Sequence, residues 1–169
     1  PSPAADVRFT PEEMAQIQVK VKESRSREGN QHGSICDGDF ASFVVTFDGK
    51  LAKEDWYCIS LSKPMNVRRV VFAHGKNFHD GGWFDASAGK PKVQVQREKG
   101  GAWETAGELA DYPATTARNN AKLKQGQSFT LRLSSPVRAV ALRVLGVPAS
   151  GDNPKQAFSS CAELQAFGE

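Results

Sequence analysis

The chain of 169 residues is long enough for one domain with a hydrophobic core of its own. Hydrophobic residues make up 39% of it and charged residues 24%, as in a globular protein, and no apolar run reaches the about 20 residues of a membrane helix. The net charge is only +3, and the lysines and arginines are scattered rather than gathered with aromatic residues. This distribution argues against nucleic acid and against a membrane as partners.

The N-terminal part is predicted to lead into a single domain over residues 10–169. Residues 1–9 have the character of a linker or tail, and the chain begins without methionine, as an excised module would. Thr10-Pro11-Glu12-Glu13 combines an N-cap with proline at the first helical position, which predicts a short helical turn.

An acidic turn comes next among the informative stretches. Asp37 and Asp39 flank a glycine, and the hydroxyl of Ser42 follows three residues on. The glycine allows a tight turn that directs oxygen atoms inward, and oxygen ligands are what a hard cation such as Ca²⁺ requires. Most such triplets are solvated turns, so a metal site needs another oxygen ligand from a distant part of the chain. Glu163, near the C-terminus, is the candidate.

The rest of the chain is a series of short apolar or alternating segments separated by glycine, proline and asparagine. The predicted strands cover residues 17–22, 43–47, 56–61, 67–73, 92–96, 102–105, 128–133, 137–144 and 160–167. About nine strands with almost no helix predict an all-β sandwich or barrel. Trp56 and Trp103 lie in strands with apolar partners and are predicted to belong to the core. Long loops at 74–91, 110–127 and 146–157 are predicted to be functional or specifically packed.

One ordered set of segments runs through nearly the whole chain. It comprises the acidic turn, the tryptophan strand 56–61 with its Lys-Pro turn, a valine-rich strand, Lys92-Val-Gln-Val-Gln before Trp103, the arginine-bearing strand 137–144 and the closing segment 161–167. This order resembles that of the discoidin-like domains, the coagulation factor 5/8 C-type family, and within it the family 32 carbohydrate-binding modules. The resemblance implies a jelly-roll β-sandwich of about eight to nine strands whose ends meet.

The resemblance also implies a metal ion. In many members of this family a structural Ca²⁺ lies between the early acidic turn and a late glutamate. Carried over residue by residue, its ligands here would be Asp37, Asp39, Ser42 and Glu163, with a structural and not a catalytic role. The alternative is a hydrated turn, with Glu163 as a surface residue of the last strand.

The same topology would bring two of the three cysteines together. A disulfide between Cys36 and Cys161 would stabilise the fold and indicate an oxidising compartment. The alternative is three reduced cysteines packed as small apolar residues, and Cys58 is expected to be buried in either case.

In sugar-binding members of the family, loops at one end of the sandwich form a shallow site. An aromatic ring stacks on the sugar there, and polar side chains bind its hydroxyl groups. The loop after residue 73 has this composition, although His74 stands where the family often has an arginine, a departure from galactose-type recognition. The predicted ligand-binding residues are His74, Lys76, Asn77, His79, Asp80, Trp83, Phe84 and, from the loop before the last strand, Phe158.

These side chains have structural alternatives. Trp83 and Phe84 would also suit a role in fixing the long loop onto the core, and His74 would suit a hydrogen-bonded position at a strand end. His79, followed by Asp80, is the better candidate for direct contact with a ligand.

The resemblance implies a non-catalytic carbohydrate-binding module, secreted or periplasmic and monomeric, that holds a glycan-active parent enzyme near its polysaccharide. A discoidin-type adhesion or lipid-binding module is the alternative, with Trp83 and Phe84 as apolar loop tips above Lys76 and Lys90. No enzyme is expected, because the chain has no Gly-x-Ser-x-Gly, no His-Glu-x-x-His and no phosphate-binding loop.

Overall fold

The computed structural model describes residues 7–8, 18–21, 31–32, 35–36 and 38–168. Every regular element in these ranges is a strand, so the all-β prediction is confirmed. No helix in them is long and apolar enough to cross a membrane. The helical turn predicted at residues 10–13 lies outside the described residues.

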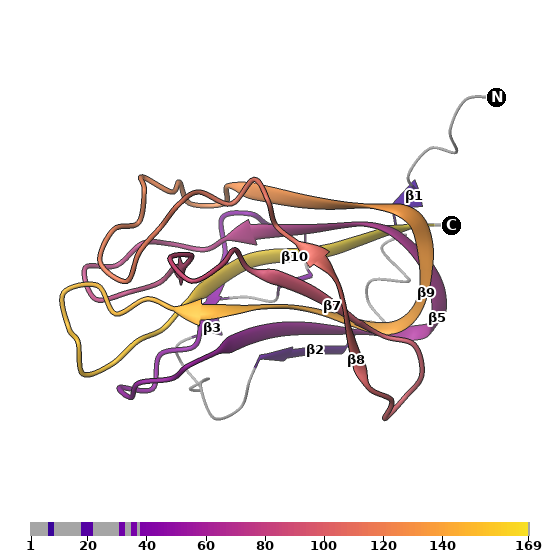
Figure 1. The fold of residues 1–169 in the computed structure, drawn as a ribbon, viewed down its shortest axis with the longest axis horizontal. Helices are drawn as coiled ribbons and strands as arrows, with labels where there is room; N and C mark the ends of the chain where they lie inside the picture. The colour runs from indigo at the N-terminus through magenta and orange to yellow at the C-terminus, as the bar shows by residue number, and fades with distance from the viewer. Residues whose placement is uncertain (1–6, 9–17, 22–30, 33–34, 37, 169) are drawn as a thin grey trace.

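Two long strands organise the molecule, and each runs through both layers of the sandwich (Figure 1). β5 (Asp55–His74) and β9 (Ser128–Pro148) are antiparallel neighbours along most of their length. Both bend sharply at the end of the molecule where β1 and the C-terminus lie. The other strands are β1 (Val7–Arg8), β2 (Gln18–Val21), β3 (Gln31–His32), β4 (Phe43–Val45), β6 (Phe84–Asp85), β7 (Lys92–Gln96), β8 (Trp103–Glu108) and β10 (Ser160–Gly168).

The pairing of the other strands with these two defines the layers. In one layer, β2 joins the first half of β5, and β7 with its hairpin partner β8 joins the second half of β9. In the other layer, β10 lies between β5 and β4, while β1 and β3 extend the sheet through β10 and β4. Thus Val7–Arg8, within the stretch predicted to be a linker, add a short strand beside the C-terminus.

The predicted strands 56–61 and 67–73 are two halves of β5, and 128–133 and 137–144 are two halves of β9. The prediction ended β5 at Lys63-Pro64, but the strand continues through the proline. The register against β9 shifts between Ser60 and Met65, so Pro64 lies in an irregular bend where no ladder hydrogen bond is required of it.

The core fills the space between the layers. In β7, Val93 and Val95 point inward while their neighbours are more exposed, as alternation requires. Phe72 of β5 and Leu164 of β10 are fully buried in the same hydrophobic cluster. Every residue of β10 is buried, including the carboxylate of Glu163.

Trp56 and Trp103 are not core residues, contrary to the prediction. Both side chains are half-buried, and both line a groove on the outer face of the layer that contains β7 and β8. Their neighbours in the strand explain the placement: Tyr57 and Ile59 are fully buried, so the alternation of β5 turns Trp56 outward.

The long loops gather at the end opposite the bends of β5 and β9 (Figure 1). They are the loops at 46–54, 75–83, 109–127 and 149–159. Main-chain hydrogen bonds tie them together: Gly82 donates to Phe158, Gly151 to Ala117 and Ala157 to Lys50. Side chains from distant parts of the sequence therefore meet on this loop end.

Candidate functional site

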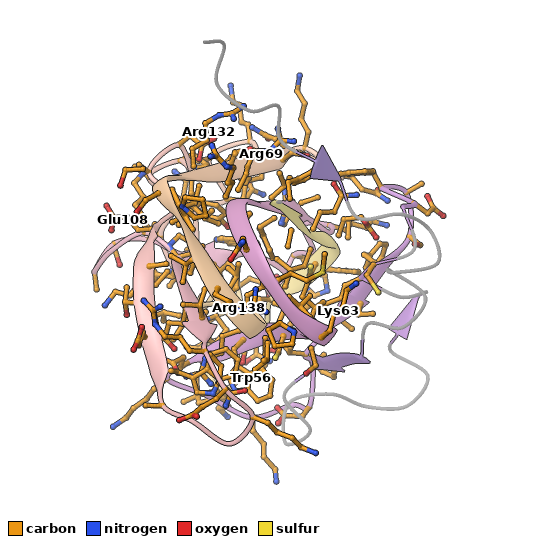
Figure 2. All side chains as sticks on the ribbon, turned by 90° about the vertical axis from the view of Figure 1, so that its right-hand side faces the viewer. Trp56, Lys63, Arg69, Glu108, Arg132 and Arg138 are labelled. Carbon is orange, nitrogen blue, oxygen red and sulfur yellow. The ribbon has the colours of Figure 1, made fainter. Side chains whose placement is uncertain are left out.

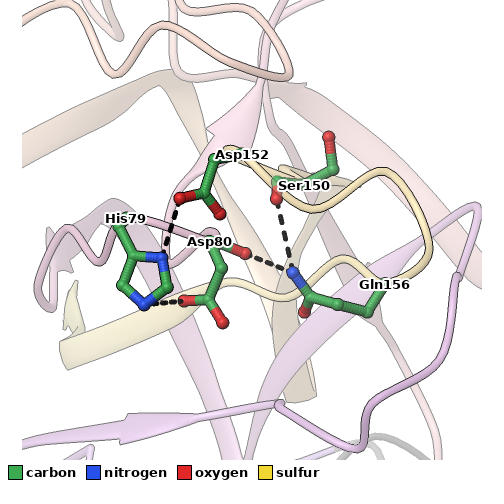
Figure 3. A network of polar contacts seen from close by, with 5 residues as sticks. All are labelled: His79, Asp80, Ser150, Asp152 and Gln156. Atoms are coloured by element: carbon green, nitrogen blue, oxygen red, sulfur yellow. Dashed lines mark hydrogen bonds and ion pairs between the residues drawn. The ribbon is translucent and has the colours of Figure 1, made fainter.

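The loop end carries a cluster of titratable side chains, the exposed His79 and Asp152 and the half-buried Asp80 (Figure 3). His79 and Asp80 come from the loop after β5, and Asp152 comes from the loop before β10. The main-chain N–H of Asp152 donates to the carbonyl oxygen of His79 at 2.9 Å, which fixes the two loops side by side. Gly151 permits this approach, because it has a φ of +58° and an added Cβ would lie 2.4 Å from the same carbonyl oxygen.

His79 is held between two carboxylates while its ring stays open to solvent. Its Nδ1 lies 2.9 Å from Oδ2 of Asp152, and its Nε2 lies 3.9 Å from Oδ1 of Asp80. The His79 side chain is 79% exposed. The hydrogen bond to Asp152, and then the charges of Asp152 and Asp80, raise the pKa of His79 above its usual 6.5. The cluster therefore offers an imidazole N–H donor beside carboxylate acceptors.

Gln156 links the two loops that carry the cluster (Figure 3). Its side chain is buried, and its amide nitrogen donates to the carbonyl oxygens of Asp80 and Ser150. One amide thus bridges the two loops that carry the exposed charges. Because the Gln156 side chain is buried, these contacts give the cluster an ordered base.

His74 and Asn77 form a hydrogen-bonded pair that holds the loop in place. His74 is 1% exposed, and its Nε2 lies 2.8 Å from Oδ1 of Asn77, whose amide nitrogen donates to the carbonyl oxygen of Leu123 at 2.8 Å. Burial lowers the pKa of His74 to about 4, so the ring is neutral at pH 7. The prediction that His74 binds the ligand is corrected, because no face of the ring is accessible.

The three aromatic side chains predicted to contact the ligand are in the core. Trp83 is 2%, Phe84 1% and Phe158 3% exposed. The indole nitrogen of Trp83 donates to the carbonyl oxygen of Thr116 at 2.8 Å, which anchors the loop to its neighbour. Stacking on a sugar requires a free ring face, so these three predictions are wrong and the packing alternative holds for Trp83 and Phe84.

Lys76 is exposed and stays available for binding. Its Nζ lies 5.5 Å from the ring centroid of Phe78, a half-buried residue that the sequence prediction did not include. Asp152 was also missed. Its Gly-Asp-Asn-Pro setting indicates a turn, but nothing in the sequence links it to His79, which lies 73 positions away.

The fold of the chain can be compared with those of solved structures. No protein-family model matches the chain, and no curated protein sequence matches it. The family 32 module of NanJ from Clostridium perfringens, in complex with galactose, covers 96% of this chain and 99% of its own with a TM-score of 0.67 and 17% identity. The chain has the discoidin fold.

Two further structures support the assignment. CpGH89CBM32-5 from Clostridium perfringens, in complex with GalNAc-β-1,3-galactose, covers 96% of this chain and 99% of its own, with a TM-score of 0.64 and 14% identity. An F5/8 type C domain from Bacteroides fragilis covers 99% of both chains, with a TM-score of 0.59 and 15% identity. At these identities the likeness is one of fold, and the resemblance inferred from the order of segments is confirmed at that level.

Within this discoidin fold, the early acidic turn and the late glutamate do meet. Glu163 is fully buried, and its Oε1 accepts a hydrogen bond from the main-chain N–H of Gly38 at 3.1 Å. Its Oε2 accepts from the amide nitrogen of Gln165 at 3.0 Å. The prediction that the two chain regions face each other is therefore correct, and Glu163 is not the surface residue of the alternative.

The acidic turn holds two further side chains with oxygen atoms, Asp39 and Ser42. Oδ1 of Asp39 accepts from the N–H of Ala41 at 2.8 Å, and the hydroxyl of Ser42 donates to the carbonyl oxygen of Asp39 at 3.3 Å. Asp37, the remaining predicted ligand, lies outside the described residues. Within the described ranges, no three histidine, cysteine or acidic side chains form a metal-binding group.

The cysteines follow the reduced alternative. No disulfide joins any two of Cys36, Cys58 and Cys161, Cys58 is buried as expected, and Cys161 is fully buried. Burial, and then the charge of Glu163, raise the pKa of the Cys161 thiol well above its usual value. No disulfide therefore supports the predicted oxidising compartment.

Proposed function

We propose that the chain is a non-catalytic carbohydrate-binding module whose site is the loop-end cluster of His79, Asp80 and Asp152, with Lys76 beside it. The observation that carries the proposal is the exposed His79 ring, which lies between two carboxylates from two adjacent loops. A sugar offers several hydroxyl groups, each both donor and acceptor, and this cluster offers both kinds of partner. Two modules of the same fold have galactose and GalNAc-β-1,3-galactose bound.

The proposal extends to a role in a larger protein. A weak sugar site gains biological effect when it is joined to a second activity, because tethering raises the local concentration of that activity at a polymer. We therefore propose a monomeric module, secreted or periplasmic, that keeps a glycan-active parent enzyme at its polysaccharide. Pull-down on insoluble polysaccharides, with the isolated chain as the protein, tests whether it binds a polymer at all.

Sugar binding is expected to depend on the His79–Asp152 pair. Calorimetric titration with galactose and GalNAc-β-1,3-galactose, extended to a glycan array, is expected to show saturable binding. His79→Ala and Asp152→Asn should each weaken it by about tenfold or more, the effect of losing one hydrogen bond to a charged group. Asp152→Asn should also lower the pKa of His79 towards 6.5, measurable by NMR titration of the ring.

Asp111→Asn serves as the matched control, because Asp111 is an exposed aspartate that bonds the main chain of β9 instead of the cluster. Its affinity should equal that of the unaltered chain. Absence of saturable binding to any glycan, or equal affinities for all three variants, would refute the loop-end site.

The adhesion or lipid-binding alternative loses its basis. It required Trp83 and Phe84 as apolar tips above basic residues, and both rings are buried. Sedimentation with anionic liposomes should therefore leave the chain in the supernatant; co-sedimentation would restore the alternative.

We further propose a structural calcium ion between the acidic turn and Glu163. What supports it is the chemistry of the donors: a fully buried carboxylate aimed at the turn, the carboxylate of Asp39 and the hydroxyl of Ser42. All are oxygen donors, which fits a hard cation that takes about six to eight oxygen ligands. Asp37 would complete the set of side chains. The ion would neutralise the buried Glu163 and tie the last strand to the turn.

Calcium is therefore expected to stabilise the fold. With free Ca²⁺ at about 100 times its Kd, the free energy of unfolding should exceed that in EDTA by about 2.7 kcal/mol. Glu163→Gln keeps the shape of the side chain and should abolish this increment in denaturant titrations. Asp48→Asn is the control, because Asp48 makes the same kind of turn contact, to the N–H of Lys50 at 2.9 Å, away from Glu163. An unaltered chain indifferent to Ca²⁺, or an equal response in Glu163→Gln, would contradict the proposal.

A further inference from the structure

A second feature suited to ligand binding lies outside the loop end. A groove of about 740 Å³ runs over the outer face of the layer formed by β5, β9, β7 and β8. Figure 2 looks onto the end of the sandwich where β5 and β9 bend, and labels Trp56 and Lys63, two of its lining residues. Ligand pockets commonly measure about 300–1,000 Å³, so the groove is of the size that holds a small ligand.

An arginine and two tryptophans near it are among the residues that line the groove. The guanidinium carbon of Arg143 lies 4.3 Å from the ring centroid of Trp103 and 5.9 Å from that of Trp56. Its Nε donates to Oε1 of Gln94 at 2.9 Å, and the amide nitrogen of Gln94 lies 3.2 Å from the hydroxyl oxygen of Thr105. These contacts hold the guanidinium plane in place, while its terminal nitrogens remain as further donors.

The charge of the groove is positive. Lys63 from the bend of β5 and Lys99 from the β7–β8 turn line it together with Arg143, and both lysines are exposed. None of the described residues that line it is an aspartate or glutamate. The carboxylate of Glu54 acts on Arg143 from outside the lining. A ligand with negative charge therefore matches the groove better than a neutral one.

The aromatic content narrows the ligand class. Half-buried indole rings provide flat apolar surface, which the C–H face of a pyranose ring covers well, and the amide of Gln96 adds polar partners for hydroxyl groups. A single-stranded nucleic acid would need a basic track continuing past the groove. Beyond it, however, Arg97 is paired with Glu104 at 2.8 Å.

We propose that this groove is a second glycan site, specific for an acidic oligosaccharide whose pyranose rings lie on Trp56 and Trp103 and whose carboxylate or sulfate groups bind Arg143, Lys63 and Lys99. The site is separate from the loop-end cluster and takes a different class of sugar. Trp56 and Trp103 can take part because they line the groove and are not buried in the core.

Intrinsic fluorescence tests the proposal directly, because Trp56 and Trp103 are two of the three tryptophans and Trp83 is buried. Oligogalacturonate (carboxylated) and a heparin oligosaccharide (sulfated) are the acidic probes; cellotetraose and oligo(dT) are the neutral and nucleic-acid probes. At least one acidic probe should change the emission saturably, and this change should weaken as salt rises. Cellotetraose and oligo(dT) should produce no saturable change. Which acidic probe binds distinguishes carboxylate from sulfate.

Three variants assign the binding to the groove. Arg143→Gln should weaken binding of the acidic probe by about tenfold or more, and Trp103→Ala should remove most of the fluorescence change. Arg138→Gln, an exposed arginine of the same strand that does not line the groove, should bind as the unaltered chain does. Circular dichroism shows whether each variant is folded, and Arg143→Lys, which keeps the charge, should lose less affinity than Arg143→Gln.

The outcomes separate this site from the loop end. Acidic binding that persists in His79→Ala supports the groove as a separate site. The loop-end proposal is rejected if no glycan binds in a way that His79→Ala or Asp152→Asn weakens. The groove proposal is overturned if neither acidic probe binds, if folded Arg143→Gln binds as tightly as the unaltered chain, or if oligo(dT) binds instead.

Discussion

Replacement of Asp55 with alanine is expected to lower the free energy of unfolding by about 3–5 kcal/mol, because it removes the acceptor of a buried network. Oδ2 of Asp55 accepts hydrogen bonds from the hydroxyl groups of Thr46 and Ser159, the latter at 2.8 Å. The hydroxyl of Tyr57 lies 2.9 Å from that of Ser159. All four residues are fully buried, so water cannot replace the lost acceptor.

The position of this network makes it relevant to the site. Thr46 follows β4, Asp55 begins β5 and Ser159 precedes β10, so the network closes the base of the loop end. Main-chain bonds run beside it, with the N–H of Thr46 donating to the carbonyl oxygen of Ser159 at 3.1 Å. Because Ser159 ends the loop that carries Asp152, Asp55→Ala should also weaken sugar binding where the protein is still folded.

Denaturant titration measures the effect. Asp55→Asn retains the size and one acceptor oxygen, so it should cost less than Asp55→Ala and separate the lost acceptor from the cavity. Lys53→Ala, at an exposed position two residues away, should change the stability by no more than about 0.5 kcal/mol. A loss below about 1 kcal/mol for Asp55→Ala would show that the network contributes little to the fold.

The inward face of a strand could be predicted where only one of its two faces is apolar. The alternation around Val93 and Val95 predicts that these two side chains point into the core, and the structure agrees. Trp56 was ambiguous because both faces of the segment are apolar: Tyr57 and Ile59 form one row, and Trp56 and Cys58 the other. Only the packing of the second layer decides which row enters the core, and Trp56 was consequently assigned to the wrong side.

The loop tryptophan was misjudged for a different reason. Trp83 follows Gly81 and Gly82, whose φ values of +138° and +111° allow the chain to turn tightly and bury the next ring. Composition alone cannot distinguish a loop that presents a ring from one that folds it inward. In the proposed cluster, His79 and Asp80 were predicted from local character and remain predictions, whereas Asp152 required the contact between two loops that only the fold provides.

Acidification is expected to destabilise the protein through His74. Burial lowers its pKa in the folded state to about 4, whereas the unfolded chain binds the proton with a pKa near 6.5. Below about pH 6.5 the unfolded state therefore binds a proton that the folded state does not. The stability contributed by neutral His74 is full above this pH, declines as pH falls, and is lost by about pH 4. Over this window the loss amounts to about 3 kcal/mol.

His74→Gln isolates this contribution from those of other groups. The glutamine does not titrate. Between pH 7 and pH 4 the unaltered chain should therefore lose about 3 kcal/mol more unfolding free energy than His74→Gln does, independently of how much the substitution destabilises the protein at pH 7. His79 acts in the opposite sense, because its raised pKa contributes stability that is present at low pH and lost as pH rises through that pKa. Parallel pH profiles for the unaltered chain and His74→Gln would mean that His74 takes up its proton in the folded state as readily as in the unfolded one. The hydrogen bonds from His74 to Asn77 and from Asn77 to Leu123 would then have to tolerate a buried charge at the base of the loop end.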